Sequence, residues 1–135
     1  MAISSSKNLK DLVNSQKPGY TLDQCFYTDP DIFQLDLDTF FLNHWIFIGH
    51  VSRIPNIGDY FLFKTGNESI ILIRGNDNEI YAHHNVCRHR GSRVCLEESG
   101  NKKLLVCPYH AWSYNIDGSL RSARLMPEDF DPKKW

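Results

Sequence analysis

The stretch "CRHRGSRVCLEESGNKKLLVCPYH", residues 87–110, decides how this chain is organised. It opens with a cysteine and a histidine two positions apart, Cys87 and His89, and it closes with a second pair three positions apart, Cys107 and His110. Both pairs fall where a predicted strand runs into a loop, so each loop offers one thiolate and one imidazole. Because both groups are metal ligands, the sequence predicts a metal site shared by two loops.

Two kinds of metal site use such a set of donors. A single zinc ion would take all four, but the usual zinc turn carries a C-x2-C or H-x3-5-H pair. A cluster of two irons and two sulfides lets one iron take both cysteines and the other both histidines, which divides the ligands of each loop between two metals. A C-x-H pair fits the cluster better, and zinc stays the alternative because it binds the same donor types. The cluster interpretation predicts a one-electron relay.

The composition narrows the setting of this site. A chain of 135 residues with 41% apolar residues is long enough for one domain with a real core and too short for two full domains. Its 15 basic and 16 acidic side chains are mixed along the chain, so we expect no nucleic-acid and no membrane partner. The first twenty residues hold no apolar run of the kind that a signal peptide or a membrane span needs. We therefore expect a cytoplasmic protein whose four cysteines are reduced.

Two short helices are expected before residue 45. The first has apolar residues at helical spacing from Leu9 and ends before Pro18. The second has Asp29 as its N-cap and Pro30 at its first position, and it runs to about Asn43. We expect its apolar face to be a packing face, formed by Phe33, Leu37, Phe40 and Phe41.

From Trp45 onward the pattern changes to short runs rich in β-branched and aromatic residues, separated by Gly, Pro and Asn. Strands are predicted at 44–52, 58–64, 69–75, 79–85, 102–106, 112–116 and 119–123. Asp117 and Gly118 give a hairpin signal before the last of them. The chain is thus predicted to be mainly β, an antiparallel meander whose strand ends carry the two loops.

The motifs "CRHRG" (87–91) and "CPYHAWSY" (107–114) resemble the two cluster-binding loops of the Rieske domain in ring-hydroxylating-type oxygenase α subunits, and the resemblance runs from about Gly19 to Arg124. It implies a Rieske-type antiparallel β-sandwich with two cluster-binding loops, preceded by an N-terminal helical arm, and a Rieske-type [2Fe-2S] cluster. The resemblance puts both cysteines on the inner iron and both histidines on the outer one, and it points the hydroxyl of Tyr114 toward a cysteine sulfur. The ligands that it implies are Cys87, His89, Cys107 and His110.

The resemblance also implies a division of the chain. Residues 1–44 would be the helical arm, 45–122 the Rieske domain, and 123–135 the start of a connection to a catalytic domain. In the family that domain holds a mononuclear Fe(II) on two histidines and one carboxylate. No histidine follows His110, so we expect the iron site only in a C-terminal domain outside these residues, and the chain to be the N-terminal part of a Rieske non-haem iron mono- or dioxygenase.

The function that the resemblance implies is electron transfer. Single electrons would come from an NAD(P)H-dependent reductase or a ferredoxin and pass to the mononuclear iron of a homotrimeric oxygenase, for O2-dependent hydroxylation or N-demethylation. A stand-alone Rieske ferredoxin is the alternative, but the arm with "YTDPDIF" and "NHWIFIGH" resembles the oxygenase entry segment, which a small ferredoxin lacks. "HWIFIGHVS", "GDYF" and "HNVCRHRGSR" look closer to α subunits that demethylate quaternary amines, such as glycine betaine or stachydrine, than to those that dihydroxylate aromatic rings.

The loops differ from those of respiratory-chain Rieske proteins, which carry an extra cysteine in each loop, joined as a disulfide. Ser92 and Tyr109 stand at those places here, and Trp112 stands where the respiratory proteins have a serine donor to the cluster. Fewer hydrogen bonds to the sulfurs imply a lower reduction potential. The remaining cysteines, Cys25 and Cys95, are expected to be packing residues.

Other polar residues near the loops have simpler interpretations. His83 and His84 alternate on a predicted strand, and neither matches a ligand of the family. Three arginines are either a solvated surface paired with two glutamates or a docking surface for an acidic electron donor. The residues concerned are Arg88, Arg90 and Arg93, with Glu97 and Glu98.

Overall fold

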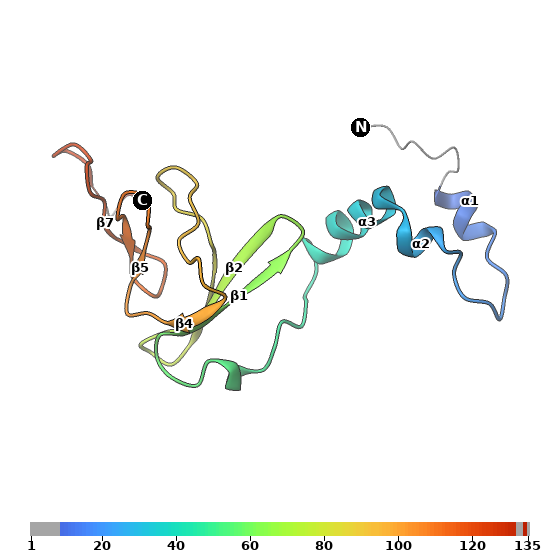
Figure 1. The fold of residues 1–135 in the computed structure, drawn as a ribbon, viewed down its shortest axis with the longest axis horizontal. Coiled ribbons are helices and arrows are strands. Elements are labelled where there is room, and N and C mark those ends of the chain that lie inside the picture. The colour runs from blue at the N-terminus through green and yellow to red at the C-terminus, as the bar shows by residue number, and fades with distance from the viewer. Residues whose placement is uncertain (1–8, 132–133, 135) are drawn as a thin grey trace. The chain divides into compact units, whose positions relative to one another are not determined.

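The structure is a computed structural model that describes residues 9–131 and 134. The chain divides into two compact units, Met1–Ile46 and Phe47–Trp135, and each is described by itself. The labelled helices belong to the first unit and the strands to the second (Figure 1). Within the described residues, no helix has both the length and the apolar character needed to cross a membrane.

The first unit consists of short helices. They are α1 (Leu9–Asn14), α2 (Cys25–Thr28), α3 (Pro30–Asp36) and a π-helical turn, Leu37–Phe41, that continues α3. The expected N-cap is confirmed, because Asp29 Oδ1 accepts hydrogen bonds from the backbone N–H groups of Asp31 (2.9 Å) and Ile32 (3.4 Å). The predicted helix thus begins where the sequence indicated, but its last turn is wound differently, and α2 was not predicted.

Within its own unit, the expected packing face of this helix is buried at only one of its four residues. Only Leu37 is buried, at 8% exposure, whereas Phe33, Phe40 and Phe41 are about half exposed. A π-helical turn has i to i+5 hydrogen bonds, as between Leu42 N and Leu37 O (3.0 Å). This wider winding moves Phe40 and Phe41 off the row that an α-helix would have given them.

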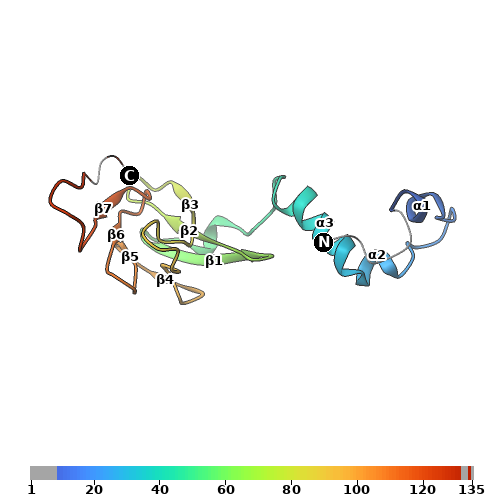
Figure 2. The same cartoon turned by 90° about the horizontal axis from the view of Figure 1, so that it is seen from above.

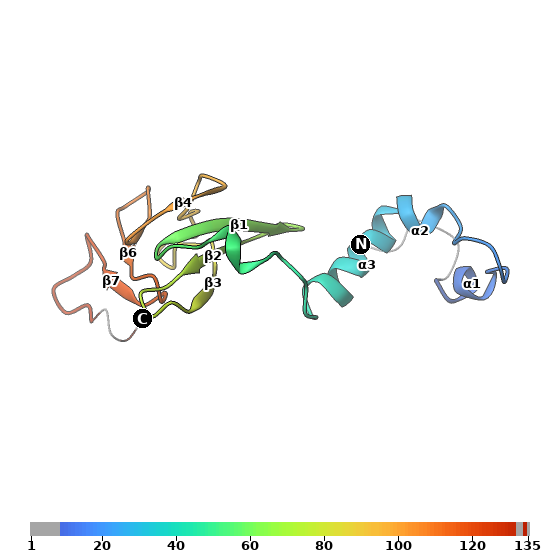
Figure 3. The ribbon, with the colours of Figure 1, turned by 90° about the horizontal axis from the view of Figure 1, so that it is seen from below.

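The second unit is built on two antiparallel sheets. The larger contains β1 (Asp59–Thr65), β2 (Glu68–Arg74), β3 (Ile80–His84) and β4 (Ser99–Asn101), in the order β3-β2-β1-β4. The smaller contains β5 (Leu105–Val106), β6 (Ser113–Tyr114) and β7 (Leu120–Ser122), in the order β5-β6-β7. Figures 2 and 3 show the smaller sheet beside one end of the longer strands. The prediction of a mainly β, antiparallel architecture is confirmed.

The core lies between the two sheets. Successive residues of β1 face opposite sides, so that Tyr60 belongs to the main core and Phe61 to a smaller cluster with Ile54 and Leu72. The main core takes residues from both sheets and both predicted loops: Tyr60, Ile71, Ile73, Cys87, Val94, Cys95, Leu105, Cys107, Trp112, Tyr114 and Ile116. The candidate cysteines are therefore part of the packed interior.

The strand predicted at 44–52 is wrong. Residues 45–50 form no regular element, and a 3-10 helix follows at Val51–Arg53. Gly49 has a φ of 146°, outside the extended region, and His50 caps the 3-10 helix by accepting a hydrogen bond from Ser52 N. The alternating side chains that suggested a strand are exposed instead: Trp45 and Phe47.

Candidate metal centre

The first of the two predicted loops, residues 87–92, is closed by its own backbone. The carbonyl oxygen of Cys87 accepts a hydrogen bond from Gly91 N (2.9 Å), and Cys87 N donates to the carbonyl of Ser92 (2.7 Å). Gly91 has a φ of 72°, a left-handed conformation that glycine adopts without strain. This first loop starts three residues after β3 ends.

The second loop, residues 107–112, has the same closure. The carbonyl of Cys107 accepts from Ala111 N (3.0 Å), and Cys107 N donates to the carbonyl of Trp112 (2.8 Å). Ala111 has a φ of 57°, and it occupies the place that Gly91 has in the first loop. Both loops thus present a cysteine at their first position and turn back through a left-handed residue at their fifth.

The two loops bring the four predicted ligand residues together. Cys87 and Cys107 are buried, at 1% and 2% exposure, and their side chains lie within hydrogen-bonding reach of each other. His89 and His110 are half-buried, and their ring centroids are 4.8 Å apart. The thiols therefore lie toward the core and the imidazoles toward the surface. Across the described residues, no three donor side chains converge on a point suited to a single ion.

The surroundings of Cys107 and His110 favour the protonation states in which these two side chains bind metals. Burial raises the pKa of Cys107, but hydrogen bonds from the backbone of Tyr109, the side chain of Cys87 and the backbone of His110 outweigh it, so the pKa lies below its ordinary value. A lowered thiol pKa favours the thiolate, which is the metal ligand. Burial, followed by the charges of His89 and Arg90, lowers the pKa of His110 and favours the neutral imidazole.

Tyr114 supports the first loop from β6. Its hydroxyl oxygen lies 3.2 Å from Cys87 Sγ and accepts a hydrogen bond from Arg88 N (3.1 Å). Burial and the hydrogen bond with Cys87 raise the pKa of Tyr114 far above its ordinary value, so the hydroxyl keeps its proton. With its oxygen accepting from the backbone, the hydroxyl can direct that proton at the sulfur. The expected direction of this side chain is confirmed.

Each of the two histidines lies against an aromatic ring. Trp112, which is 1% exposed, stacks on His89 with centroids 4.7 Å apart and an interplanar angle of 9°. The Trp112 indole N–H donates to the carbonyl of Arg124 (3.2 Å), which fixes the ring in its plane. On the outer side, the exposed ring of Tyr109 lies 3.8 Å from that of His110. The sequence marked Trp112 only as a replacement for a serine and missed its contact with His89.

The other residues considered from the sequence lie outside this group. His83 Nε2 is bonded to the carbonyl of Ile116 (2.7 Å), and His84 lies 3.5 Å from a Glu68 carboxylate on an exposed surface. Cys95 is buried at 2% exposure, as expected of a packing residue. All four cysteines, each within the described ranges, are thiols and not disulfides.

The suggested pairing of the loop arginines with glutamates is wrong where contacts are described. Arg93 donates to the carbonyl of Asn67 (3.0 Å), and Glu98 pairs with Lys64 (2.5 Å). Arg90 lies over the ring of Tyr109, with its guanidinium carbon 5.7 Å from the centroid. Arg90 and Arg93 therefore contact groups other than the acidic residues that follow them in the sequence.

Comparison with known proteins agrees with this geometry. The sequence profile of the Rieske [2Fe-2S] domain matches residues 44–129. The oxygenase subunit of glycine betaine monooxygenase from Chromohalobacter salexigens is 43% identical over 90% of this chain and 27% of its own length. The α subunit of benzene 1,2-dioxygenase from Pseudomonas putida is 38% identical over 84% of this chain and 26% of its own.

A solved structure shows the same fold. The apo form of the quaternary ammonium Rieske monooxygenase CntA superposes with a TM-score of 0.73 at 39% identity, over 82% of this chain and 33% of that one. The chain thus spans about a quarter to a third of the length of these relatives. The cofactor of such a domain is a [2Fe-2S] cluster, and the paired thiols and imidazoles of the two loops fit it. Since the profile covers well over half of the residues, the chain belongs to the Rieske [2Fe-2S] domain family.

Proposed function

We propose that Cys87, His89, Cys107 and His110 bind the [2Fe-2S] cluster and that this domain carries single electrons within an oxygenase. The observation that carries the proposal is the repeated loop closure, which places two buried thiols inward and two half-buried imidazoles outward. When bound, such a cluster accepts and releases one electron at a time.

The chain's own residues would perform three tasks. The cysteines supply thiolates in a water-poor interior, and the histidines supply neutral imidazoles near the surface, where a partner protein can approach. The stacked ring of Trp112 holds His89 in one orientation, and the hydroxyl of Tyr114 directs a proton toward Cys87. These contacts fix the ligands before the metal binds, and such supporting groups matter for metal affinity.

Electron paramagnetic resonance (EPR) of the reduced protein tests the ligand set. Protein purified without oxygen should contain iron and acid-labile sulfide, and its dithionite-reduced form should give the spectrum of a cluster with mixed histidine and cysteine ligands. Zinc would give no such spectrum, so the measurement also decides between the two metals. Iron-free protein with bound zinc would overturn the proposal.

Substitution of single histidines sharpens the test. His89→Cys and His110→Cys should each abolish the mixed-ligand spectrum or prevent cluster assembly. His84→Cys is the matched control, because His84 is an exposed histidine of β3 outside both loops and should leave the spectrum unchanged. An unchanged spectrum in either loop variant would contradict the ligand assignment.

The role in a larger enzyme follows from the relatives. We propose that residues 45–122 form the electron-transfer domain, with 1–44 as a helical arm and 123–135 as the connection to a C-terminal domain that holds a mononuclear Fe(II). Electrons would come from an NAD(P)H-dependent reductase or ferredoxin, and the oxygenase would be a homotrimer in the cytoplasm, where thiols stay reduced. Stopped-flow reduction by candidate donors and light scattering of the oxygenase test these points.

A quaternary amine is the proposed substrate class of that oxygenase. Support comes from the relatives that act on glycine betaine, at 43% and 39% identity, beside 38% for the benzene enzyme. O2 uptake that depends on glycine betaine and releases formaldehyde would support this class. Uptake with benzene and none with quaternary amines would overturn it.

A further inference from the structure

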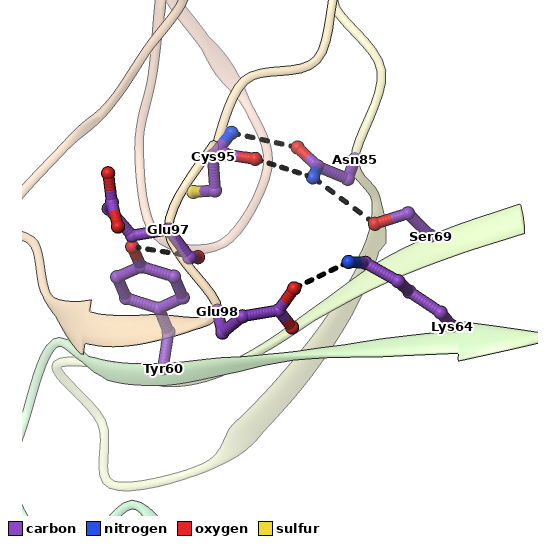
Figure 4. Close-up of polar contacts among 7 residues, drawn as sticks. All are labelled: Tyr60, Lys64, Ser69, Asn85, Cys95, Glu97 and Glu98. Atoms are coloured by element: carbon purple, nitrogen blue, oxygen red, sulfur yellow. Dashed lines mark hydrogen bonds and ion pairs between the residues drawn. The ribbon is translucent and has the colours of Figure 1, made fainter.

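The chain enters the first loop at Asn85 and returns from it at Val94 and Cys95, and we call these residues the base of the loop. A buried asparagine holds this base together. Asn85 is 1% exposed and lies two residues before Cys87. Its Oδ1 accepts from the backbone N–H groups of Val94 (2.9 Å) and Cys95 (2.8 Å), and its Nδ2 donates to the Cys95 carbonyl (2.8 Å) and to Ser69 Oγ (3.2 Å). Figure 4 shows this side chain between Ser69 on β2 and the returning chain at Cys95. Every hydrogen-bonding position of the amide is thereby used.

The chain below the second loop is held in a different way. Directly beneath it, β5 and β6 pair through their backbones, Leu105 with Tyr114 and Val106 with Ser113. The chain that returns from the first loop, residues 92–97, forms no strand, although all of it is described. Three hydrogen bonds between the Asn85 amide and the backbone of residues 94–95 take the place of the strand pair below the second loop. The Asn85 side chain thus joins the two ends of the first loop, as the pairing of β5 with β6 joins the two ends of the second.

Contacts further along the returning chain lie beyond the base of the loop. Leu62 N donates to the carbonyl of Glu98 (2.8 Å), and Tyr60 Oη lies 3.4 Å from the carbonyl of Glu97. The Lys64–Glu98 ion pair in Figure 4 joins two side chains that are more than half exposed, so water screens it. These contacts hold residues 97–98 on β1, whereas the backbone of residues 94–95 is bonded through Asn85.

We propose that Asn85 is a positioning residue for cluster binding: it fixes the base of the first loop and so places Cys87 and His89 opposite the second loop. This inference rests on the proposed ligand set. Asn85 N also donates to the carbonyl of Ser69 (2.8 Å), which continues the ladder between β2 and β3. Asn85 therefore connects the sheet to the returning chain. Cys87 lies in the segment between Asn85 and Val94, both of which are held by hydrogen bonds.

Loss of the Asn85 amide removes the hydrogen-bond partner of three backbone groups at residues 94–95. In Asn85→Ala, the N–H groups of Val94 and Cys95 and the carbonyl of Cys95 lose their partner in a region where Cys95 is 2% exposed. Buried backbone groups without partners are costly, so the returning chain must shift to reach water. That shift would separate Cys87 and His89 from the second loop.

The test compares cluster release to an iron chelator in the anaerobically purified protein and its variants. Asn85→Ala should release iron roughly 10- to 100-fold faster than the parent, as other supporting residues of metal sites do, and its EPR spectrum should broaden or shift. Ser69→Ala removes only the Nδ2–Oγ bond and should stay close to the parent rate. Leu72→Ala, in the separate cluster with Ile54 and Phe61, lowers stability without touching the loop and should leave the spectrum unchanged.

Hydrogen exchange in the parent protein supplies a measurement that needs no variant. The amide protons of Val94 and Cys95 should exchange as slowly as those of the buried strand residue Ile73. Fast exchange at 94–95, a parent-like release rate and spectrum in Asn85→Ala, or equal effects in Leu72→Ala would each overturn the inference. A parent protein without iron and sulfide would instead overturn the ligand set itself, so the two failures are distinguishable.

Discussion

Replacing Tyr114 by phenylalanine should lower the reduction potential of the bound cluster while leaving the fold intact. The substitution removes one oxygen atom, which lies 3.2 Å from Cys87 Sγ and 3.1 Å from Arg88 N. The ring itself stays, and with it the packing of a residue that is 7% exposed. The change is therefore confined to one hydrogen bond toward a proposed ligand and one from the backbone of the first loop.

The size of the effect follows from the charge of the reduced state. A hydrogen bond to a charged acceptor contributes about 1.5–3 kcal/mol, and reduction adds one negative charge that such a donor stabilises further. If about 1–2 kcal/mol of this appears only on reduction, the potential should fall by about 40–90 mV, because about 59 mV corresponds to a tenfold change for one electron. The direction is fixed, since removal of a donor always disfavours the more negative state.

Protein-film voltammetry of the parent and the variant measures this potential directly. Tyr81→Phe is the control, because the Tyr81 hydroxyl contacts Asp77 (2.5 Å) outside both loops and should not alter the potential. The EPR spectrum must stay of the mixed-ligand type in both variants. A Tyr114→Phe protein with an intact spectrum and the parent potential would refute the view that this hydroxyl donates to the cluster's sulfur ligand.

Three further changes test the fold around the site. Gly118→Ala should destabilise the protein by about 1–3 kcal/mol in urea unfolding, because Gly118 has a φ of 89° and an added Cβ would lie 2.7 Å from the His83 ring. Asp29→Ala removes the N-cap of α3 and should cost that helix about 1 kcal/mol, seen as lost helical circular dichroism. Hydrogen bonds from the side chain and backbone of Ser119 hold the pKa of Asp117 below its ordinary value, so its stabilising effect should be present above about pH 4 and vanish as pH falls through the lowered pKa. Asp117→Asn should flatten that part of the unfolding profile.

The strands that carry the site were predictable because their side chains alternate. β1 and β2 are rich in β-branched and aromatic residues and meet at Gly66 and Asn67, and the observed register pairs Thr65 with Glu68 across that turn. The cysteine and histidine pairs stand out as candidate ligands for a different reason. Metals select their ligands by element, so Cys87, His89 and their counterparts could be proposed as ligands without any knowledge of the fold.

The failures share a physical cause, which is that local pattern does not report long-range pairing. The segment around Trp45 and Phe47 alternates as a strand does, but a strand also needs a neighbour to pair with, and among the described strands none pairs with it. β4 (Ser99–Asn101) has no apolar residue to indicate it, yet it pairs with β1. In both cases the presence or absence of a pairing partner outweighed local composition.

Positioning residues are difficult to predict from local sequence for the same reason, because their role depends on contacts with distant residues. Asn85 and Trp112 bind no metal in our proposal, and their types have many uses elsewhere in proteins. Asn85 is identified as a positioning residue by the hydrogen bonds between its amide and the backbone of residues 94–95. Trp112 is identified by its ring, which stacks on that of His89. Because the second loop is closed by backbone pairing, side-chain changes at its base should disturb it little. Below its own closing hydrogen bonds, the first loop is held at residues 94–95 by the Asn85 amide, so its base should tolerate substitution less well.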